Sequence, residues 1–157
     1  MILGILSDTH DNIPKIIKAV KFFNSKKVDF VFHAGDFIAP FTVDKLNKLK
    51  CGWRGVFGNN DGEKKGLKSK AKGKIRQAPL RMKLKGRNIT LVHDIKSIDL
   101  TKESSDIVIF GHTHKPEVVS DPRRLIVNPG ECGGWLYGRS TLALVDTDSL
   151  RVRIIKI

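Results

Sequence analysis

An α/β fold is predicted for this chain of 157 residues. Before Asp61, three short apolar segments alternate with two segments of helical periodicity, which is the pattern of parallel strands joined by helices. After Gly86 the chain consists mostly of short apolar segments separated by turn residues, as in antiparallel strands. The length fits one domain with one core, so we expect a single domain over residues 1–157.

The parallel part is predicted from its apolar spacing and its helix start signals. Asp11 or Asn12 can cap a helix that accepts Pro14 in its first turn, and a second helix is expected from about Pro40. Apolar residues recur at helical spacing in both, at positions 13, 16, 17, 20 and 23 and at positions 43, 46 and 49. The three strands are expected at Ile2–Leu6, Val28–His33 and Gly52–Phe57.

The second half is predicted to hold a loop, a hairpin and further strands. The segment Gly62–Ala78 is rich in Lys and Gly with little apolar periodicity, so we expect a loop with at most a short helix. Gly86-Arg87-Asn88 is the expected turn of a hairpin. Strands are expected at 81–85, 89–92, 107–110, 118–119, 125–127, 140–145 and 150–155, with a short polar helix after His93 and turns at 128–130 and 147–149.

The composition excludes several protein classes. Apolar residues make up 40% of the chain, which argues against disorder, and no apolar run approaches the ~18–20 residues that a membrane span needs. The apolar N-terminal run has no basic start and leads directly to Asp8 and His10, unlike a secretory signal. Cys51 and Cys132 form no CxxC pair, so we expect free thiols and a cytoplasmic protein.

The charge is strongly basic and unevenly distributed. The formal net charge is +13, and the stretch from Lys64 to Arg87 has eleven basic residues and no Asp or Glu. Such a stretch attracts polyanions, including nucleic acid. A solvated basic face that aids solubility is the alternative, and the same two interpretations hold for Lys64, Lys65 and Arg87 as contacts to an anionic substrate.

Side chains that bind metals follow five of the predicted strands: Asp8 and His10, Asp36, Asn59, His93, and His112 and His114. Carboxylate, imidazole and amide oxygen together suit Mn, Fe, Ni or Zn, and less selectively Mg. Seven ligands exceed the needs of one tetrahedral ion, so we predict two ions. Asp36 is the expected bridge, because it stands alone at the end of a central strand. Two ions ~3.5–4 Å apart can clamp a transferring phosphoryl group and activate a water molecule as the nucleophile.

The spacing within the ligand pairs has a physical reason. At the frayed end of a strand, residues i and i+2 point the same way. We therefore expect Asp8 and His10 to converge on one point, and His112 and His114 likewise.

Three glycines and one further histidine belong to the same pattern. Gly35, Gly58 and Gly111 precede ligands, and each is expected to permit a sharp turn of the backbone. Of the five histidines, only His33 lies outside the ligand set. We expect it in the core or behind the ligands, and we expect Cys132 to pack in the core.

The ordered motifs resemble the calcineurin-like metallophosphoesterases, and more narrowly their small archaeal and bacterial phosphodiesterases, whose family also includes the retromer scaffold subunit. The matching motifs span most of the chain: Ser7-Asp8-Thr9-His10, His33-Ala34-Gly35-Asp36, Gly58-Asn59-Asn60-Asp61, Val92-His93, Gly111-His112-Thr113-His114 and Asn128-Pro129-Gly130. The resemblance implies a four-layer α/β/β/α sandwich, in which two mixed sheets are flanked by helices, with a dinuclear metal site.

The resemblance also implies a division of the ligands, an activity and an assembly. One metal would take Asp8, His10, Asp36 and His114, and the other would take Asp36, Asn59, His93 and His112. Similar small members use Mn or Ni and hydrolyse phosphodiesters, and a homodimer is also implied.

Three departures from the family pattern bear on activity. Asn60 stands where many family phosphatases have a His that can protonate the leaving group. Its amide can bind phosphate but cannot supply a proton, so poor leaving groups should react slowly; Asn60 and Asp36 are the predicted catalytic residues. Asp94 replaces the usual Gly, and its charge could stabilise the metals or repel substrate. The segment from His93 to Gly111 is short for the family, which predicts a less covered site.

Three functions fit these observations. The full ligand set favours a metal-dependent phosphodiesterase. A protein-binding scaffold of the same fold, with weak or no catalysis, is the second hypothesis, and such a protein would be expected to have lost ligands. The stretch Lys64–Arg87 motivates the third, a phosphoesterase directed at nucleic acid.

Overall fold

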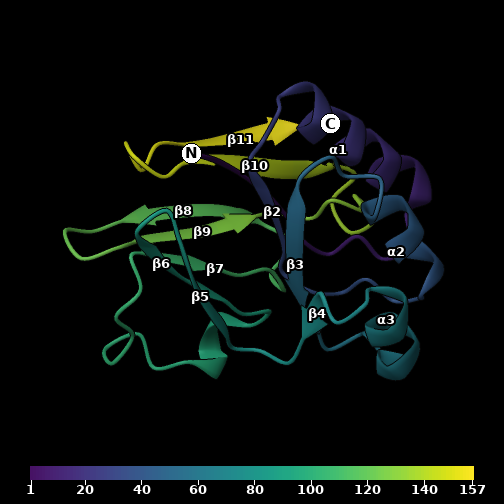
Figure 1. Cartoon of the computed structure of the whole chain (residues 1–157), viewed down its shortest axis with the longest axis horizontal. Helices are drawn as coiled ribbons and strands as arrows, with labels where there is room; N and C mark the ends of the chain where they lie inside the picture. The colour runs from purple at the N-terminus through teal and green to yellow at the C-terminus, as the bar shows by residue number, and fades with distance from the viewer.

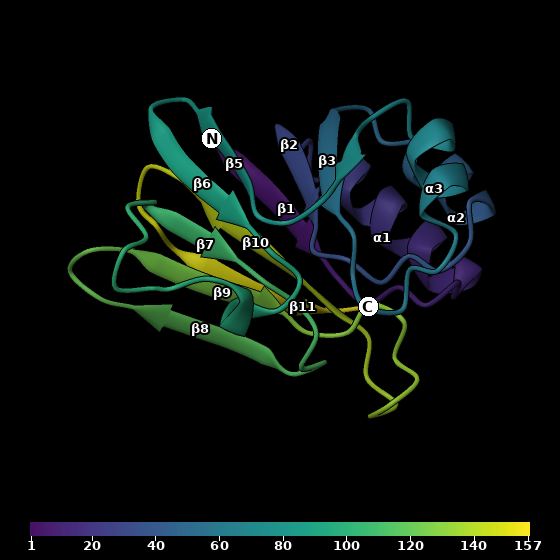
Figure 2. The same cartoon turned by 90° about the horizontal axis from the view of Figure 1, so that it is seen from below.

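Two β-sheets lie face to face in the computed structural model, which describes residues 1–157. Figures 1 and 2 show the helices on the outer face of the larger sheet and the smaller sheet on its other side. The larger sheet has six strands in the order β11-β10-β1-β2-β3-β4, and the smaller has five in the order β5-β6-β7-β9-β8. The predicted α/β class with two mixed sheets is confirmed.

The larger sheet contains the predicted parallel unit. Strands β1 (Ile2–Leu6), β2 (Phe30–His33) and β3 (Gly52–Val56) run parallel and are joined by helices α1 (Ile13–Ser25) and α2 (Phe41–Leu46). The Asn12 side chain caps α1 by accepting a hydrogen bond from the Lys15 backbone N–H. Strands β10 (Thr141–Asp146) and β11 (Val152–Lys156) form the predicted antiparallel pair, and β10 also pairs antiparallel with the other side of β1, a placement that was not predicted.

Two hydrophobic clusters fix the layers. A cluster of 18 buried residues, among them Phe23, Val43 and Trp53, joins the helices to the larger sheet. A second cluster of 13 fills the space between the sheets and includes Ile5 from one and Ile109 from the other. Because close-packed interiors resist deformation, this packing holds the strand ends of both sheets in fixed relative positions.

The segment Gly62–Ala78 contains more regular structure than the sequence predicted. It forms the short helix α3 (Lys64–Lys70) and a two-residue strand, β4 (Ile75–Arg76), which pairs with β3. Leu67, Ala71 and Ile75 are fully buried. They repeat every four residues, so an apolar stripe was present among the lysines but was too narrow to predict the strand that follows the helix.

The predicted hairpin forms the first two strands of the smaller sheet. It consists of β5 (Leu80–Leu84) and β6 (Arg87–Leu91), paired antiparallel. Its turn is the pair Lys85-Gly86 rather than residues 86–88. Both residues have positive φ, +46° and +86°, the combination that twists a two-residue turn to match the strands.

The remaining strands correct one part of the prediction. Strand β9 (Leu125–Pro129) pairs antiparallel with β8 (Pro116–Ser120), as expected, but parallel with β7 (Ile107–Ile109) on its other side. After β7 the chain forms the edge strand β8 and then turns back to form β9 between β7 and β8. For this reason β9 runs in the same direction as β7. The expected turn at 128–130 is also displaced, since Asn128 and Pro129 belong to β9 and the chain leaves the sheet at Gly130, with φ +78°.

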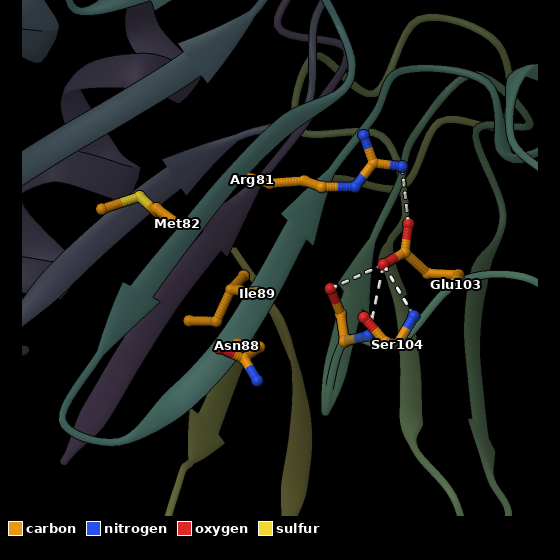
Figure 3. Close-up of a pocket in the computed structure, with 7 residues that line it drawn as sticks. Arg81, Met82, Asn88, Ile89, Glu103 and Ser104 are labelled. Carbon is orange, nitrogen blue, oxygen red and sulfur yellow. Dashed lines mark hydrogen bonds and ion pairs between the residues drawn. The ribbon is translucent and has the colours of Figure 1, made fainter.

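A thin layer covers part of the outer face of the smaller sheet and leaves the edge strand β8 exposed. It is formed by the segment after β6, whose only helix is the single 3-10 turn η1 (Ile95–Ser97). Glu103 anchors the segment: it accepts hydrogen bonds from Arg81 Nη2 at 2.9 Å and Ser105 Oγ at 2.9 Å (Figure 3). A hollow of about 280 Å³ lies beside these groups. No helix in the structure, including the 13-residue α1, has both the length and the apolar character for crossing a membrane.

Glu103→Gln is expected to lower stability in a pH-dependent manner. Burial acts to raise the pKa of Glu103, but hydrogen bonds from Arg81 and Ser105 outweigh it and hold the pKa below its ordinary value. A lowered carboxylate pKa stabilises the fold above the unfolded value of about 4.3, and this contribution is lost as pH falls through the folded value. We expect a cost of ~1–2 kcal/mol at pH 7, or roughly 2–8 °C in Tm, that disappears in acid.

Thermal unfolding between pH 3 and pH 8 measures this difference. Glu117→Gln is the matched control, because Glu117 is exposed on β8 and makes no ion pair. A gap between wild type and Glu103→Gln that stays constant over the whole pH range would contradict the assignment.

Candidate metal centre

The seven predicted ligands lie together where strands of both sheets end. Three strands of the larger sheet contribute, and so do β6 and β7 of the smaller one. The two sheet edges are joined directly, because the His112 backbone N–H donates to Asp8 Oδ2 at 3.2 Å. The residues collected there are Asp8, His10, Asp36, Asn59, His93, His112 and His114.

One group of four side chains already has the form of a cation site. The ligand atoms of Asp8, His10, Asp36 and His114 all lie within 4.8 Å of one another. Asp8 Oδ1 and His10 Nε2 are buried and have no hydrogen-bond partner, although buried polar atoms almost always have one. Burial also raises the pKa of Asp8, because desolvation disfavours its charged form. A divalent cation would satisfy both atoms, so the residues fit the metal that the sequence predicted.

A second group surrounds Asn59. Its Oδ1 lies 2.7 Å from His93 Nε2 and 2.9 Å from His112 Nδ1. The other ring nitrogen of His93 is 2.7 Å from the Ala34 carbonyl, and a carbonyl can only accept, so Nδ1 is the donor there. Nε2 is thereby directed at Asn59 Oδ1, and the two atoms together could bind one cation.

Asp36 stands between the two groups. Its Oδ2 lies 3.7 Å from His10 Nε2 on one side and 3.5 Å from His93 Nε2 on the other. The side chain is almost completely buried. This position suits the predicted bridge.

The backbone brings the ligands together in a manner that the sequence did not predict. Asp8, His10, Asp36, His112 and His114 all have positive φ, between +41° and +67°, a conformation that is uncommon for residues other than glycine. The expected explanation, an extended strand end with i and i+2 on one side, is therefore wrong. The strand β1 ends at Leu6, before the ligands begin.

The two histidines of Gly111-His112-Thr113-His114 diverge. His114 Nε2 lies 3.6 Å from Asp8 Oδ1, whereas His112 Nδ1 lies 2.9 Å from Asn59 Oδ1. They therefore reach different groups instead of one point, which agrees with the division of ligands that the family resemblance implies.

The glycines before the ligands act in two ways. Gly35 has φ +100°, as the predicted sharp turn requires. At Gly58 and Gly111 the φ angle is not positive, and the reason is space: a Cβ on Gly58 would collide with the Asp36 carboxylate, and one on Gly111 with Ser7 Oγ.

Gly58→Ala is therefore expected to displace Asp36 and lower metal affinity. We expect a loss of roughly 10–100-fold, the range seen when the supports of metal ligands are changed, with the fold retained. Titration of the metal-free variant with Mn²⁺, followed by calorimetry, measures it. Gly62→Ala is the control, because a Cβ there meets no atom within 4 Å; equal affinity in both variants would contradict the steric explanation.

Two buried carboxylates that the sequence analysis did not single out support the ligands. Asp61 accepts hydrogen bonds from the backbone N–H groups of Phe37 at 2.7 Å, Ile38 at 2.8 Å and Gly58 at 2.8 Å, and so ties the Asp36 loop to the Asn59 loop. Glu131 lies 3.3 Å from His114 Nδ1. The only signals were their places, at the end of Gly-Asn-Asn-Asp and directly after Asn-Pro-Gly.

Asn60 and Asp94, two residues that depart from the family pattern, each make specific hydrogen bonds. Asn60 donates to both oxygens of Asp36, from its backbone N at 2.8 Å and its Nδ2 at 2.7 Å, so it positions the predicted bridge. Asp94 caps η1, where its carboxylate accepts the Lys96 N–H at 2.9 Å. Its negative charge is thus partly engaged outside the ligand groups.

His33 and Cys132 lie in the core, as expected. His33 is fully buried, accepts the Gly35 N–H and contacts Thr9 Oγ1 at 3.1 Å. Burial lowers its pKa well below the ordinary value, so the ring is neutral and braces the loops behind Asp8 and Asp36. Cys132 is buried in the larger cluster, and desolvation raises its pKa to about 12.

The basic residues of the stretch Lys64–Arg87 are not gathered on one face beside the candidate metal centre. They are spread over α3, β4, β5 and β6, and three of them pair internally: Lys70 with Asp44, Arg81 with Glu103 and Arg87 with Asp106. Arg87 begins β6, whose opposite end leads to His93. Lys64 and Lys65 are exposed on α3, as expected.

One side of the centre is open to solvent. Asn59, Asn60 and His112 are exposed, whereas Asp8 and Asp36 are buried. The second group can therefore be reached by a molecule from outside, as the short segment between His93 and Gly111 predicted.

Comparisons with known proteins agree with this geometry. Residues 1–150 match the calcineurin-like phosphoesterase superfamily domain. A phosphodiesterase from Methanocaldococcus jannaschii is 33% identical over 161 residues, which cover 98% of this chain and 97% of that protein. A solved structure described as a novel archaeal phosphodiesterase is 33% identical, with a TM-score of 0.93 and 100% of both chains covered.

A more distant solved structure shows the same fold. Vps29 from Entamoeba histolytica, in complex with Zn²⁺, has 21% identity and a TM-score of 0.73, with 100% of this chain and 98% of that chain covered. The predicted relation to the retromer subunit is confirmed at the level of the fold. From its motifs, its fold and these matches, the chain belongs to the calcineurin-like phosphoesterase superfamily.

Proposed function

We propose that this chain is a divalent-metal-dependent phosphodiesterase that uses two metal ions, Mn²⁺ by preference. The carrying observation is the gathering of seven metal-binding side chains around Asp36, with two buried ligand atoms that lack any other partner. The relative from Methanocaldococcus jannaschii that is named a phosphodiesterase supports this choice within the superfamily.

The two groups define which residues would hold each ion. One ion would take Asp8, His10, Asp36 and His114, and the other would take Asp36, Asn59, His93 and His112, with Asp36 shared. When bound, two such ions supply charge stabilisation for the phosphoryl oxygens and lower the pKa of a water molecule so that it can attack phosphorus.

The chain's own residues position the reaction. Asn60 holds the Asp36 carboxylate through two N–H groups, and its exposed position beside the open side favours a contact to phosphate as well. Its amide cannot donate a proton to the leaving group. Esters with good leaving groups, such as aryl phosphates, should therefore react fastest.

The test is a metal-dependent assay. The purified protein is stripped of metals, supplied with Mn²⁺, and assayed with bis(p-nitrophenyl) phosphate beside p-nitrophenyl phosphate. Turnover of the diester well above that of the monoester is expected. Absence of turnover of either ester with every first-row divalent metal would refute the proposal.

The scaffold alternative has less support. A protein kept only for assembly should have lost ligands, yet all seven are present and adjacent. A homodimer and binding of nucleic acid through Lys64–Arg87 remain predictions. Sedimentation velocity tests the first, and the salt dependence of DNA and RNA affinity tests the second.

A further inference from the structure

We propose that the loop between β9 and β10, together with Lys115 and Lys156, forms a subsite for the nucleoside arm of a phosphodiester substrate. The inference rests on the proposed phosphodiesterase function and names its substrate class: a nucleotide ester that carries a second phosphate. In Figure 2 this loop, yellow-green, projects from the body of the molecule. We call its exposed segment, Trp135-Leu136-Tyr137, the aromatic segment.

The subsite adjoins the metal centre. A hollow of about 600 Å³ begins at His114, one of the predicted ligands. A second hollow of about 310 Å³ lies between His10, His114 and Trp135. A substrate with its reacting phosphate at the centre would therefore extend one arm past His114 into the larger hollow, which is lined by Lys115, Pro116, Tyr137, Arg139, Thr141 and Lys156 as well as His114.

The charge of the larger hollow indicates an anionic ligand. Lys115, Arg139 and Lys156 line it, and no Asp or Glu does. None of the three makes an ion pair within the chain. Three positive charges beside the proposed centre would attract a phosphate other than the one that reacts.

The aromatic segment is exposed but held in place. Trp135 is 67% exposed and Tyr137 48% exposed, which is unusual for large apolar side chains so close together. Trp135 Nε1 donates to the His10 carbonyl at 3.1 Å, and the Trp135 backbone N–H donates to Glu131 at 2.7 Å. Lys115 Nζ lies 5.6 Å from the centroid of the Tyr137 ring.

An exposed ring beside cations that make no ion pair suits a nucleotide. Stacking on an aromatic side chain accepts any base, because every base has a π-face. Tyr137 would therefore take the base while Arg139 and Lys156 take the second phosphate. A protein partner would also cover the aromatic segment, but it would not account for an acid-free hollow that opens from a predicted metal ligand.

Three esters that share the same leaving group test the subsite. They are methyl p-nitrophenyl phosphate, thymidine 5′-(p-nitrophenyl phosphate) and its 3′-phosphorylated form. In each, water adds to phosphorus, the bond to the aryl oxygen breaks and p-nitrophenolate leaves, so the chemical step is shared. We expect kcat/KM to rise roughly 10-fold from the methyl to the thymidine ester, and to rise again with the 3′-phosphate in a salt-sensitive manner.

Variants test which residues cause each of the two increases in kcat/KM. Tyr137→Ala should reduce the ratio of thymidine to methyl ester roughly 10-fold, and Tyr137→Phe should retain it. Arg139→Ala and Lys156→Ala should each reduce the advantage of the 3′-phosphate and its dependence on salt. Lys85→Ala is the charge-matched control, because Lys85 lies in the turn of the β5–β6 hairpin at the far end of the sheet.

The outcomes separate this inference from the proposed function. Equal kcat/KM for the three esters would overturn the subsite but would not affect the proposed phosphodiesterase function. If no ester is hydrolysed, calorimetric binding of thymidine 3′,5′-bisphosphate decides: about 10-fold weaker binding by Tyr137→Ala supports the subsite, and unchanged binding overturns it. A dimer that Tyr137→Ala dissociates, without any ester preference, would instead assign the aromatic segment to a second copy of the chain and overturn the inference.

Discussion

Asp36→Asn is expected to lower kcat for an aryl phosphodiester by about 10³-fold. Asp36 is the one carboxylate that lies between both ligand groups, 3.7 Å from His10 Nε2 and 3.5 Å from His93 Nε2. An amide is a weaker and uncharged ligand, so both ions would be held loosely. Metal ions contribute several kcal/mol of transition-state stabilisation, and ~4 kcal/mol corresponds to the stated loss at 1.36 kcal/mol per tenfold.

Two further variants make the measurement specific. Asp44→Asn removes the same charge from an exposed pair with Lys70 and should leave kcat unchanged. Asn60→Ala should impair turnover while elemental analysis still finds both metals. If Asn60→Ala emptied the site, the hydrogen bonds to Asp36 would be essential for metal binding, and the division between ligand and positioning residue would be wrong.

Removing the divalent ions is expected to lower the Tm by about 10 °C. Asp8 and Asp36 are both buried, and a bound cation compensates their desolvation in the folded state alone. A ligand at 1,000 times its Kd stabilises a fold by ~4 kcal/mol, and each kcal/mol shifts Tm by ~2–4 °C for a chain of this size. Differential scanning calorimetry with Mn²⁺ and with a chelator measures the shift.

The double variant His10→Ala/His114→Ala is the control for this shift. It removes two side chains of the first ligand group, so its Tm should respond much less to Mn²⁺. The same Tm for the wild type with and without metal, in a protein that elemental analysis shows to be loaded, would contradict the prediction.

The order of the elements and the convergence of the seven candidate ligands were predictable from the sequence, for related reasons. A buried parallel strand needs an apolar run, so the polar residues that end it are conspicuous, as with Asp8 after Ile2–Leu6. The structure then brought all seven predicted residues together. Their backbone conformation was not predictable, because left-handed φ at Asp8 or His114 depends on contacts with distant segments such as Gly35 and Glu131.

Features that depend on tertiary contacts were missed for the same reason. Asp61 looked like one turn residue among several, and its role appears only when the loops that donate to it are adjacent. The parallel pairing of β7 with β9 followed from the path of β8, which local alternation does not encode. The aromatic segment had no periodicity, and only its place beside His114 gives it a meaning.

The position of β1 has a consequence for synthesis on the ribosome. This strand pairs with β2 on one side and with β10 on the other, where Ile2 is opposite Asp146 and Leu3 is opposite Val145. While the nascent chain is shorter than residue 141, one edge of β1 has no partner, and exposed apolar edges promote aggregation. Such contacts between distant segments also slow folding. The segment after β1 that carries Asp8 and His10 therefore gains its final support only near the end of translation, when β10 pairs with β1.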